Sequence, residues 1–579
     1  MKFATVAQVF ATIEVESSRN EMTKLLAELL SGASAEEARL ICYFALGKMR
    51  AVYQGTKFEF GEKMMRGVVQ VMLGLEQQEF KKQMQQVGDL GDLVRTQGYN
   101  GDHNLTLQDV YTRLEAFENI SGVGSADEKA QALLYFLQRV DSLSACYIIR
   151  MIIGKLRLGF SEMTILDALS WMHAGNKSMK KRIEHAYNIS ADIGLIAQAL
   201  KEGGMEAIDE ISITMGVPIR PAAAERLPTA KDIVAKIGEC VAEPKLDGFR
   251  LQVHVEKKNG DFEHHFFSRN LLDMTNMFPE IKSELARLPI QELIIEGEAI
   301  AYDEQTGSYL PFQETVKRRR KYDIQEMAQE VPLKLVVFDI LYVNGESWLN
   351  KAQTTRQKKI HELFDGYSER ILVSEEVAIH TARQLEDYFN KQISLGLEGV
   401  VVKKPHAYYQ PGKRNFNWIK LKRQEEGELE DTIDAVVLGY YAGKGKRAKF
   451  GIGAFLIGVF NRKKDRFETV AKVGTGLTDD KWRELKQKCD VLAVDEPPKN
   501  VVVSKELAPT VWVVPELVVV VQADEITESP AHTAAKTENK RGYALRFPRF
   551  IEFCSDKRAI DATTVTELKR LFEDQRPSS

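Results

Sequence analysis

The sequence predicts a multidomain protein with an all-α N-terminal domain, an α+β core and a small C-terminal β-barrel. Its 579 residues are too many for one hydrophobic core. Apolar residues recur at helical spacing up to about residue 216, strands and helices mix up to about residue 423, and short apolar strands dominate the remainder. We therefore expect three domains, at residues 1–216, 217–424 and 425–579.

The N-terminal region carries start and stop signals of helices. Ser18 and Glu21 have the spacing of a capping box, and the apolar residues that follow at helical spacing stop at Gly32. Ser34 and Glu37 repeat the signature. Two further helices are predicted, over residues 130–140 and 163–172.

A turn between two predicted helices, residues 154–159, has the sequence Gly-Lys-Leu-Arg-Leu-Gly. Two glycines around two cations would let backbone N–H groups and basic side chains approach phosphates. An ordinary helix–helix turn is an equally common origin of this pattern.

The α+β core follows a linker at residues 218–221, where two prolines restrict their neighbours to extended geometry. Helices are predicted over residues 354–364 and 381–394. Strands are predicted at residues 249–255, 264–268, 293–302, 335–342 and 399–404.

The C-terminal region begins after an acidic segment, residues 425–431, which we interpret as a hinge. Strands are predicted at residues 435–441, 453–460, 466–473, 511–523 and 543–553. Short strands separated by glycine-rich and charged turns favour a Greek-key barrel, for which an OB-fold is the natural candidate, and a β-sandwich is the alternative.

The composition is that of an ordinary soluble globular protein, with 44% hydrophobic and 28% charged residues. A formal net charge of −4 does not exclude a nucleic-acid partner, because basic residues gathered on one face are what matter. Two basic runs, residues 317–321 and 444–449, are either such contacts or solvated loops.

The five cysteines are scattered without a C-x-x-C pair, which predicts a reduced intracellular protein with neither disulfides nor a zinc site. No signal-peptide pattern and no 18-residue apolar span is present. We expect a cytoplasmic protein with no membrane partner.

The candidate nucleophile is Lys245, in the sequence Glu-Pro-Lys-Leu-Asp-Gly-Phe-Arg at residues 243–250. A lysine beside an acidic turn before an apolar strand can attack a nucleotide phosphate, whereas the alternative is a surface lysine ahead of a hairpin turn. An ordinary lysine has a pKa of about 10.4, so a nucleophilic Lys245 needs a pKa lowered by partial burial and cationic neighbours.

Further motifs follow in a fixed order. The motifs are Ser268-Arg269-Asn270, residues 295–298 ending in Glu298, residues 337–342 containing Phe338, residues 398–404 beginning with Glu398, and residues 418–422. If the last motif is a strand, Lys420 and Lys422 share one face, which is consistent with phosphate neutralisation, although an exposed amphipathic strand has the same pattern. This series resembles that of the covalent nucleotidyltransferases, and most closely the three-domain ATP-dependent DNA ligases of archaea and eukaryotes, over nearly the whole chain.

The resemblance implies a role for each residue. Lys245 would form a lysyl–AMP phosphoramidate with ATP, and Phe338, which spacing alone would place in the core, would stack on adenine. Glu298 and Glu398 would position Mg²⁺. The remaining nucleotide contacts implied are Glu243 at the adenine edge, Arg250 and Glu298 at the ribose, and Arg269, Arg414, Lys420 and Lys422 more broadly.

The implied function is that of an ATP-dependent DNA ligase that seals nicked double-stranded DNA in three steps: self-adenylylation, AMP transfer to the 5′-phosphate and attack by the 3′-hydroxyl. The domains would be a helical DNA-binding domain, an adenylation domain and an OB-fold domain, in a monomer. NAD-dependent DNA ligases usually carry a four-cysteine zinc module, so its absence favours ATP. The sequence leaves open whether a sliding clamp recruits the enzyme.

The last motif, residues 545–550, implies that Arg546, Arg549 or Lys557 meets the pyrophosphate. The chain departs from the family at residues 552–555, where basic character is lost, and at residues 222–224, where three alanines replace bulkier residues. The alternative functions are an RNA ligase or capping-type nucleotidyltransferase, or a catalytically silent DNA-binding scaffold.

Overall fold

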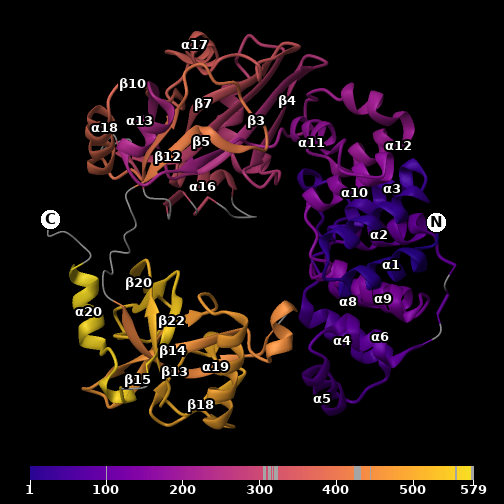
Figure 1. Cartoon of the computed structure of the whole chain (residues 1–579), viewed down its shortest axis with the longest axis vertical. Helices are drawn as coiled ribbons and strands as arrows, with labels where there is room; N and C mark the ends of the chain where they lie inside the picture. The colour runs from indigo at the N-terminus through magenta and orange to yellow at the C-terminus, as the bar shows by residue number, and fades with distance from the viewer. Residues whose placement is uncertain are drawn as a thin grey trace. The chain divides into compact units, whose positions relative to one another are not determined.

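The protein forms two compact units, Met1–Arg423 and Gln424–Ser579 (Figure 1). The structure, a computed structural model, describes residues 1–99, 101–102, 104–303, 308–310, 314–315, 317–318, 324–422, 432–443, 445–554 and 557–574. The expected hinge at residues 425–431, Lys444 and residues 319–321 of the basic runs lie outside the described residues.

The first part of the larger unit is helical, as expected. Ser18 accepts a hydrogen bond from the backbone N–H of Glu21, and Ser34 and Glu37 form a full capping box. Apolar faces of these helices meet in one shared core. The helices are α1 (Phe3–Val15), α2 (Arg19–Ser31), α3 (Ala35–Ala45), α4 (Glu62–Leu73), α5 (Gln77–Val87), α6 (Leu90–Gln97), α7 (Leu107–Asn119), α8 (Ser125–Leu137), α9 (Ser142–Ile152), α10 (Glu162–Ala174), α11 (Lys180–Ile189) and α12 (Ile193–Asp209).

Two sheets form the α+β part of this unit. One has the order β1-β12-β11-β2-β10, and the other has the order β4-β3-β5-β7-β8, with β6 beside β5 and β9 beside β7. The first contains β1 (Ala223–Arg226), β2 (Cys240–Lys245), β10 (Val377–Ile379), β11 (Gly399–Lys403) and β12 (Arg414–Lys422). The second contains β3 (Phe249–Lys258), β4 (Asp261–Ser268), β5 (Glu292–Asp303), β7 (Leu333–Val343) and β8 (Glu346–Ser347), with β6 (Ser308–Tyr309) and β9 (Ile371–Val373).

Helices cover the outer faces of these sheets. Ile233 of α13 (Ala230–Ile237) and Leu385 of α18 (Ala382–Ser394) pack on the first sheet with Ile419 and Leu421 of β12 (Figure 1). Ile360 of α17 (Gln353–Phe364) packs in the core of the second sheet. Two shorter helices, α14 (Pro279–Leu285) and α16 (Ile324–Glu330), complete this part. The five expected strands and two expected helices of the core are confirmed, within a few residues at their ends.

The smaller unit is built mainly on antiparallel strands. Its main sheet has the order β16-β18-β13-β14-β15-β17, with β19 paired to β13 and β22, while β20 and β21 form a separate pair. The elements are β13 (Ile433–Tyr441), β14 (Ala454–Asn461), β15 (Arg466–Val473), α19 (Asp479–Val491), β16 (Ala493–Val494), β17 (Val501–Val502), β18 (Val511–Val513), β19 (Val518–Gln522), β20 (Glu525–Ser529), β21 (Gly542–Arg546), β22 (Arg549–Cys554) and α20 (Val565–Asp574).

Two of the expected strands are each broken in two. Residues 511–523 divide into β18 and β19 at a turn that contains Pro515. Residues 543–553 divide into β21 and β22 at Phe547, whose φ is 50°, and Pro548. A proline lacks the N–H that a strand interior needs, so both apolar runs turn where a proline stands. The expectation of single strands was wrong there.

The basic run at residues 317–321 is not a free surface patch in its described part. Arg318 is buried and pairs with Glu280 at 2.7 Å, and it donates to the carbonyls of Met277 and Val331.

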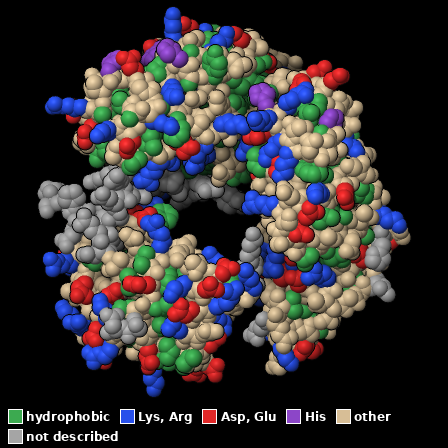
Figure 2. All heavy atoms as spheres, in the orientation of Figure 1, with side chains coloured by type: hydrophobic (Ala, Val, Ile, Leu, Met, Phe, Trp, Pro, Cys, Tyr) green, Lys and Arg blue, Asp and Glu red, His purple; other side chains and the backbone are tan. Residues whose placement is uncertain are grey.

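Acidic and basic side chains are interspersed over the face seen in Figure 2. No helix in the described part of the chain is both long enough and apolar enough to cross a membrane.

Candidate active site

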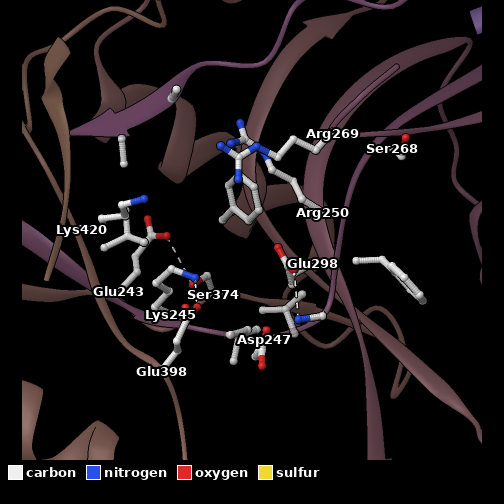
Figure 3. Close-up of a pocket in the computed structure, with 18 of the residues that line it drawn as sticks. Glu243, Lys245, Asp247, Arg250, Ser268, Arg269, Glu298, Ser374, Glu398 and Lys420 are labelled. Carbon is white, nitrogen blue, oxygen red and sulfur yellow. Dashed lines mark hydrogen bonds and ion pairs between the residues drawn. The ribbon is translucent and has the colours of Figure 1, made fainter. Parts of the chain in front are cut away.

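A pocket of about 750 Å³ lies between the two sheets of the larger unit. The chain crosses from β2 of the first sheet to β3 of the second through Leu246-Asp247-Gly248. Lys245 is the last residue of β2 and lines the pocket at this crossing. In Figure 3, Lys245, Glu398 and Lys420 lie on one side of the pocket, and Arg250, Arg269 and Glu298 lie on the other. The hairpin alternative for Lys245 is excluded, because β2 and β3 belong to different sheets.

The backbone around this crossing is tightly packed. A Cβ atom at Gly248 would lie 2.4 Å from the carbonyl oxygen of Ala299. The backbone N–H of Gly248 instead donates to Glu298 at 3.1 Å. Only glycine allows this approach of the crossing to β5. Glycine at position 248 therefore holds Lys245 and Glu298 in one pocket.

The ammonium of Lys245 forms an ion pair with Glu398, which also pairs with Lys422. The three side chains remain partly exposed, at 22%, 28% and 23%. Burial lowers the pKa of Lys245. The cations Arg269 and Arg250 lower this pKa further, whereas the carboxylates of Glu298 and Asp247 raise it. The direction is the one that a nucleophilic amine requires.

A second charged pair lies deeper in the pocket. Lys403 on β11 and Glu243 on β2 pair at 2.5 Å, with side chains 1% and 4% exposed. Lys403 also donates to the carbonyl oxygen of Phe338 at 2.9 Å. Burial raises the pKa of Glu243, and Lys403 opposes that shift. These fixed partners make this end of the pocket rigid.

Phe338 faces the pocket rather than the core alone. It is half-buried and lines the pocket, and its ring meets that of Trp418 edge-on at 6.1 Å. The guanidinium of Arg250 lies 5.5 Å from the Phe338 ring and 5.4 Å from the Trp418 ring. An aromatic face is therefore available beside buried polar groups, as base recognition requires.

The strand β12 places its lysines as its sequence pattern predicts. Ile419 and Leu421 are buried in the core of the first sheet, whereas Lys420 and Lys422 line the pocket. Burial, Lys245 and Arg269 lower the pKa of Lys420. Arg414, at the start of the same strand, is exposed and is not among the residues that line the pocket. All the other nucleotide and metal residues expected from the sequence line it.

The carboxylates expected to hold a metal are Glu298 and Glu398. Both line the pocket, and burial raises the pKa of Glu298 to about 7, against the influence of Lys245 and Arg250. Among the residues that the structure describes, no group of three or more His, Cys, Asp or Glu side chains is arranged to hold a metal ion. Mg²⁺ commonly takes one or two carboxylates and completes its shell with phosphate oxygens and water, so this donor set fits Mg²⁺ beside a bound nucleotide.

The other predicted basic residues are paired with acids in their own units. In the helical turn, Lys155 pairs with Glu62, and Arg157, at a φ of 68°, pairs with Asp89 at 3.2 Å. In the smaller unit, the C-terminal motif residues form exposed ion pairs. These are Arg546 with Glu525 and Arg549 with Asp524, both at 2.5 Å, and Lys557 with Asp434.

Several polar residues at or behind the pocket were not anticipated, among them Lys57 and Asp273, which line it. Ser374, between β9 and β10, lines it, and no sequence pattern pointed to it. Glu296 and Tyr409 are buried behind Arg250. Glu296 stands in the same motif as Glu298. The two residues are two positions apart in a strand, so the sequence could have indicated that Glu296 shares the face of Glu298.

Known proteins similar to this chain are DNA ligases. Residues 221–422 match the family model of the ATP dependent DNA ligase domain, residues 2–170 that of the DNA ligase N terminus, and residues 448–557 that of the ATP dependent DNA ligase C terminal region. A probable DNA ligase of Dictyoglomus turgidum is 42% identical over 100% of this chain and 98% of that protein. DNA ligase 1 of Methanosarcina acetivorans is 34% identical over 99% of this chain and 100% of that protein. The solved structure Pmar-Lig_PreS3 shares the fold with a TM-score of 0.55 at 17% identity, over 95% of this chain and 99% of that one.

Proposed function

The chain belongs to the ATP-dependent DNA ligases, and we propose that Lys245 is the residue that it adenylylates. In the first step Lys245 Nζ would attack the α-phosphorus of ATP, forming a P–N bond while the bond to pyrophosphate breaks. The AMP then passes to the 5′-phosphate of a DNA nick, and the 3′-hydroxyl displaces AMP to form the phosphodiester. The observation that carries this assignment is the position of Lys245 in the pocket, where the chain crosses between the sheets and the pKa of Lys245 is lowered.

The other pocket residues take roles that follow from where they lie. Glu243 and Phe338, at the rigid end, would bind adenine, and Arg250 and Glu298 would bind the ribose. Lys420 and Lys422 would neutralise phosphate charge beside Lys245. Arg269 would join them, whereas Arg414 would have to move to do so, because it lies outside the pocket lining.

Glu298 and Glu398 would hold Mg²⁺ together with the nucleotide phosphates, where the ion would neutralise the charge that develops on the leaving group. Glu398 pairs with two lysines, Lys245 and Lys422. Its carboxylate is therefore already held at the phosphate side of the pocket by groups that ligands can displace.

We also propose the domain division 1–216, 217–424 and 425–579, with the first domain gripping duplex DNA and the last being an OB-fold. The short, mainly antiparallel strands of the smaller unit and the pairing of β19 with both β13 and β22 support a fold of that kind. A monomeric state and a cytoplasmic location stay predictions from the sequence, and recruitment by a sliding clamp stays open.

Transfer of label from ATP to the full-length protein tests the proposed function. With Mg²⁺ and ATP labelled in the α-phosphate, we expect a labelled protein band, because AMP stays attached. ATP labelled in the γ-phosphate is the control and should leave the protein unlabelled, because pyrophosphate leaves. Absence of α-label on the protein would contradict the proposal.

A further inference from the structure

A closed ring of hydrogen bonds lies behind the pocket. Arg250 Nη1 donates to the carbonyl oxygen of Ala222 at 2.8 Å, and Arg250 Nη2 donates to Glu296 Oε2 at 2.9 Å. The hydroxyl of Tyr409 donates to the same oxygen of Glu296 at 2.9 Å. The backbone N–H of Ala222 closes the ring by donating to the hydroxyl of Tyr409 at 2.9 Å. Four groups from distant parts of the chain thus fix one another.

The ring is buried on the side away from the pocket. Tyr409 is 3% exposed and Glu296 is 1% exposed, and neither lines the pocket, whereas Arg250 does. In a water-excluded site each of these bonds is strong, and a partner left unpaired is costly. The hydroxyl of Tyr409 and the carboxylate of Glu296 meet the pocket-lining Arg250 in this ring, while the aromatic ring of Tyr409 packs edge-on against Trp418 at 5.7 Å.

Arg250 keeps unused donor capacity toward the pocket. A guanidinium has five N–H donors, and the ring uses one on each Nη atom. Arg250 Nε is buried and has no hydrogen-bond partner among the described residues. The Nε atom is closed to solvent, but the Arg250 side chain as a whole is 18% exposed and lines the pocket. The guanidinium is thus held in place, and the ring leaves the second N–H of each Nη atom for a ligand.

The backbone side of the ring is also immobilised. Ile219 and the side chain of Gln252 exchange two hydrogen bonds, at 2.7 and 2.9 Å. The carbonyl of Arg220 accepts from Gly412 N–H at 2.9 Å, and Ala223 N–H donates to the carbonyl of Lys413 at 3.0 Å. Ala222 therefore presents its N–H and its carbonyl at fixed points, and this segment leads directly from the helical region.

We propose that Tyr409 is a positioning residue for nucleotide binding, which with Glu296 and the backbone of Ala222 holds Arg250 against Phe338 and Trp418 in the orientation that receives ATP. This inference rests on the proposed function, because it takes ATP as the ligand of the pocket. Arg250 binds the nucleotide, and the hydroxyl of Tyr409 acts through Arg250. A change at Tyr409 consequently weakens nucleotide binding without touching the nucleophile.

The test is Tyr409→Phe, which removes one hydroxyl and keeps the ring of the side chain. The readout is the dissociation constant of α,β-methylene-ATP, an analogue whose α–β bridge cannot be cleaved, so it is measurable in variants of any activity. We expect Tyr409→Phe to weaken binding about tenfold, because a guanidinium that the ring no longer holds must be ordered when the analogue binds. In label transfer from ATP, KM should rise about as much while kcat stays near that of the wild type.

A matched control separates positioning from general loss of a buried hydrogen bond. The hydroxyl of Tyr43, in the helical core, donates to Asp192 at 2.6 Å, so Tyr43→Phe removes the same group from the same kind of partner. We expect Tyr43→Phe to leave analogue binding unchanged. If Tyr409→Phe does not fold, Glu296→Gln is the second variant, and it should also weaken analogue binding about tenfold.

A double-mutant cycle shows whether Tyr409 acts through Arg250. Arg250→Lys keeps the charge but loses the planar fork. In that background, Tyr409→Phe should weaken analogue binding no further. An undiminished effect in the Arg250→Lys background, or wild-type binding by Tyr409→Phe, would overturn the inference while the proposed function stands. A wild-type protein that takes no α-label from ATP would overturn both.

Discussion

The two charged groups of the pocket differ in how firmly they are held. The inner pair, Glu243 and Lys403, has side chains 4% and 1% exposed. The outer cluster, in which Glu398 pairs with Lys245 and Lys422, has side chains 22–28% exposed. Breaking a buried pair leaves an uncompensated charge, whereas exposed pairs exchange partners at little cost. The pocket is therefore rigid at the inner end, which we propose binds the base, and adaptable at the outer end, which we propose binds the phosphates.

The largest effect is expected in the outer cluster at the nucleophile. Lys245→Arg should reduce formation of the enzyme–AMP adduct by about 10⁴-fold or more, because the guanidinium keeps its proton and offers no lone pair. Label transfer from α-labelled ATP measures this loss. Binding of the variant to nicked DNA is the control for folding. Labelling at the wild-type rate would remove Lys245 from the mechanism.

The inner pair should show its effect in stability. Lys403→Met leaves the Glu243 carboxylate buried without its partner, so the free energy of unfolding should fall by about 3 kcal/mol in denaturant titrations. Lys422→Met, the matching change in the outer cluster, should cost less than about 1 kcal/mol. Equal losses in the two variants would erase the distinction between the inner pair and the outer cluster.

Glu398 belongs to the outer cluster, and we propose that it holds the metal. Removing divalent ions with EDTA should stop label transfer, and Glu398→Gln should lower its rate by about 100-fold while raising the Mg²⁺ concentration needed for half-maximal rate. Glu362→Gln, at an exposed carboxylate of α17, is the matched control and should behave as the wild type. An unchanged Mg²⁺ requirement in Glu398→Gln would place the metal elsewhere.

The C-terminal motif extends the comparison, because Arg546 and Lys557 form exposed ion pairs like those of the outer cluster. The variant Arg546→Ala/Lys557→Ala should adenylylate itself about tenfold more slowly, since Arg546, Arg549 or Lys557 is expected to meet the pyrophosphate. It should seal a nick that already carries the 5′-adenylate at nearly the wild-type rate. Single-turnover rates on the two substrates decide the matter, and an equal loss on both would give the motif a role in DNA binding or folding.

The sequence was informative about the pocket because strand geometry constrains it. Alternation alone placed Lys420 and Lys422 on the pocket side of β12 and Ile419 in the core. It could not find β2, which holds Lys245, because Pro244 interrupts the run. Pro244 is tolerated because β10 pairs only with residues 240–242 of β2. At Pro244 the strand β2 is paired on one side only, with β11, so the other side needs no backbone N–H.

What the sequence could not provide was pairing between distant residues. Tyr409 stands far along the chain from Glu296, and only the fold brings its hydroxyl to that carboxylate. Arg318 looked like part of a basic surface run, yet a distant glutamate, Glu280, holds it inside. Ion-pair partners are set by three-dimensional packing, and local residue patterns do not encode them.

The site of the AMP adduct tests the central claim most directly. The full-length enzyme would be incubated with ATP and Mg²⁺, digested, and its peptides sequenced by mass spectrometry. We expect AMP on Lys245 and loss of the adduct in mild acid, as a P–N bond requires. An adduct on Lys420 or Lys422 instead, or an acid-stable one, would contradict the assignment of Lys245 as the nucleophile.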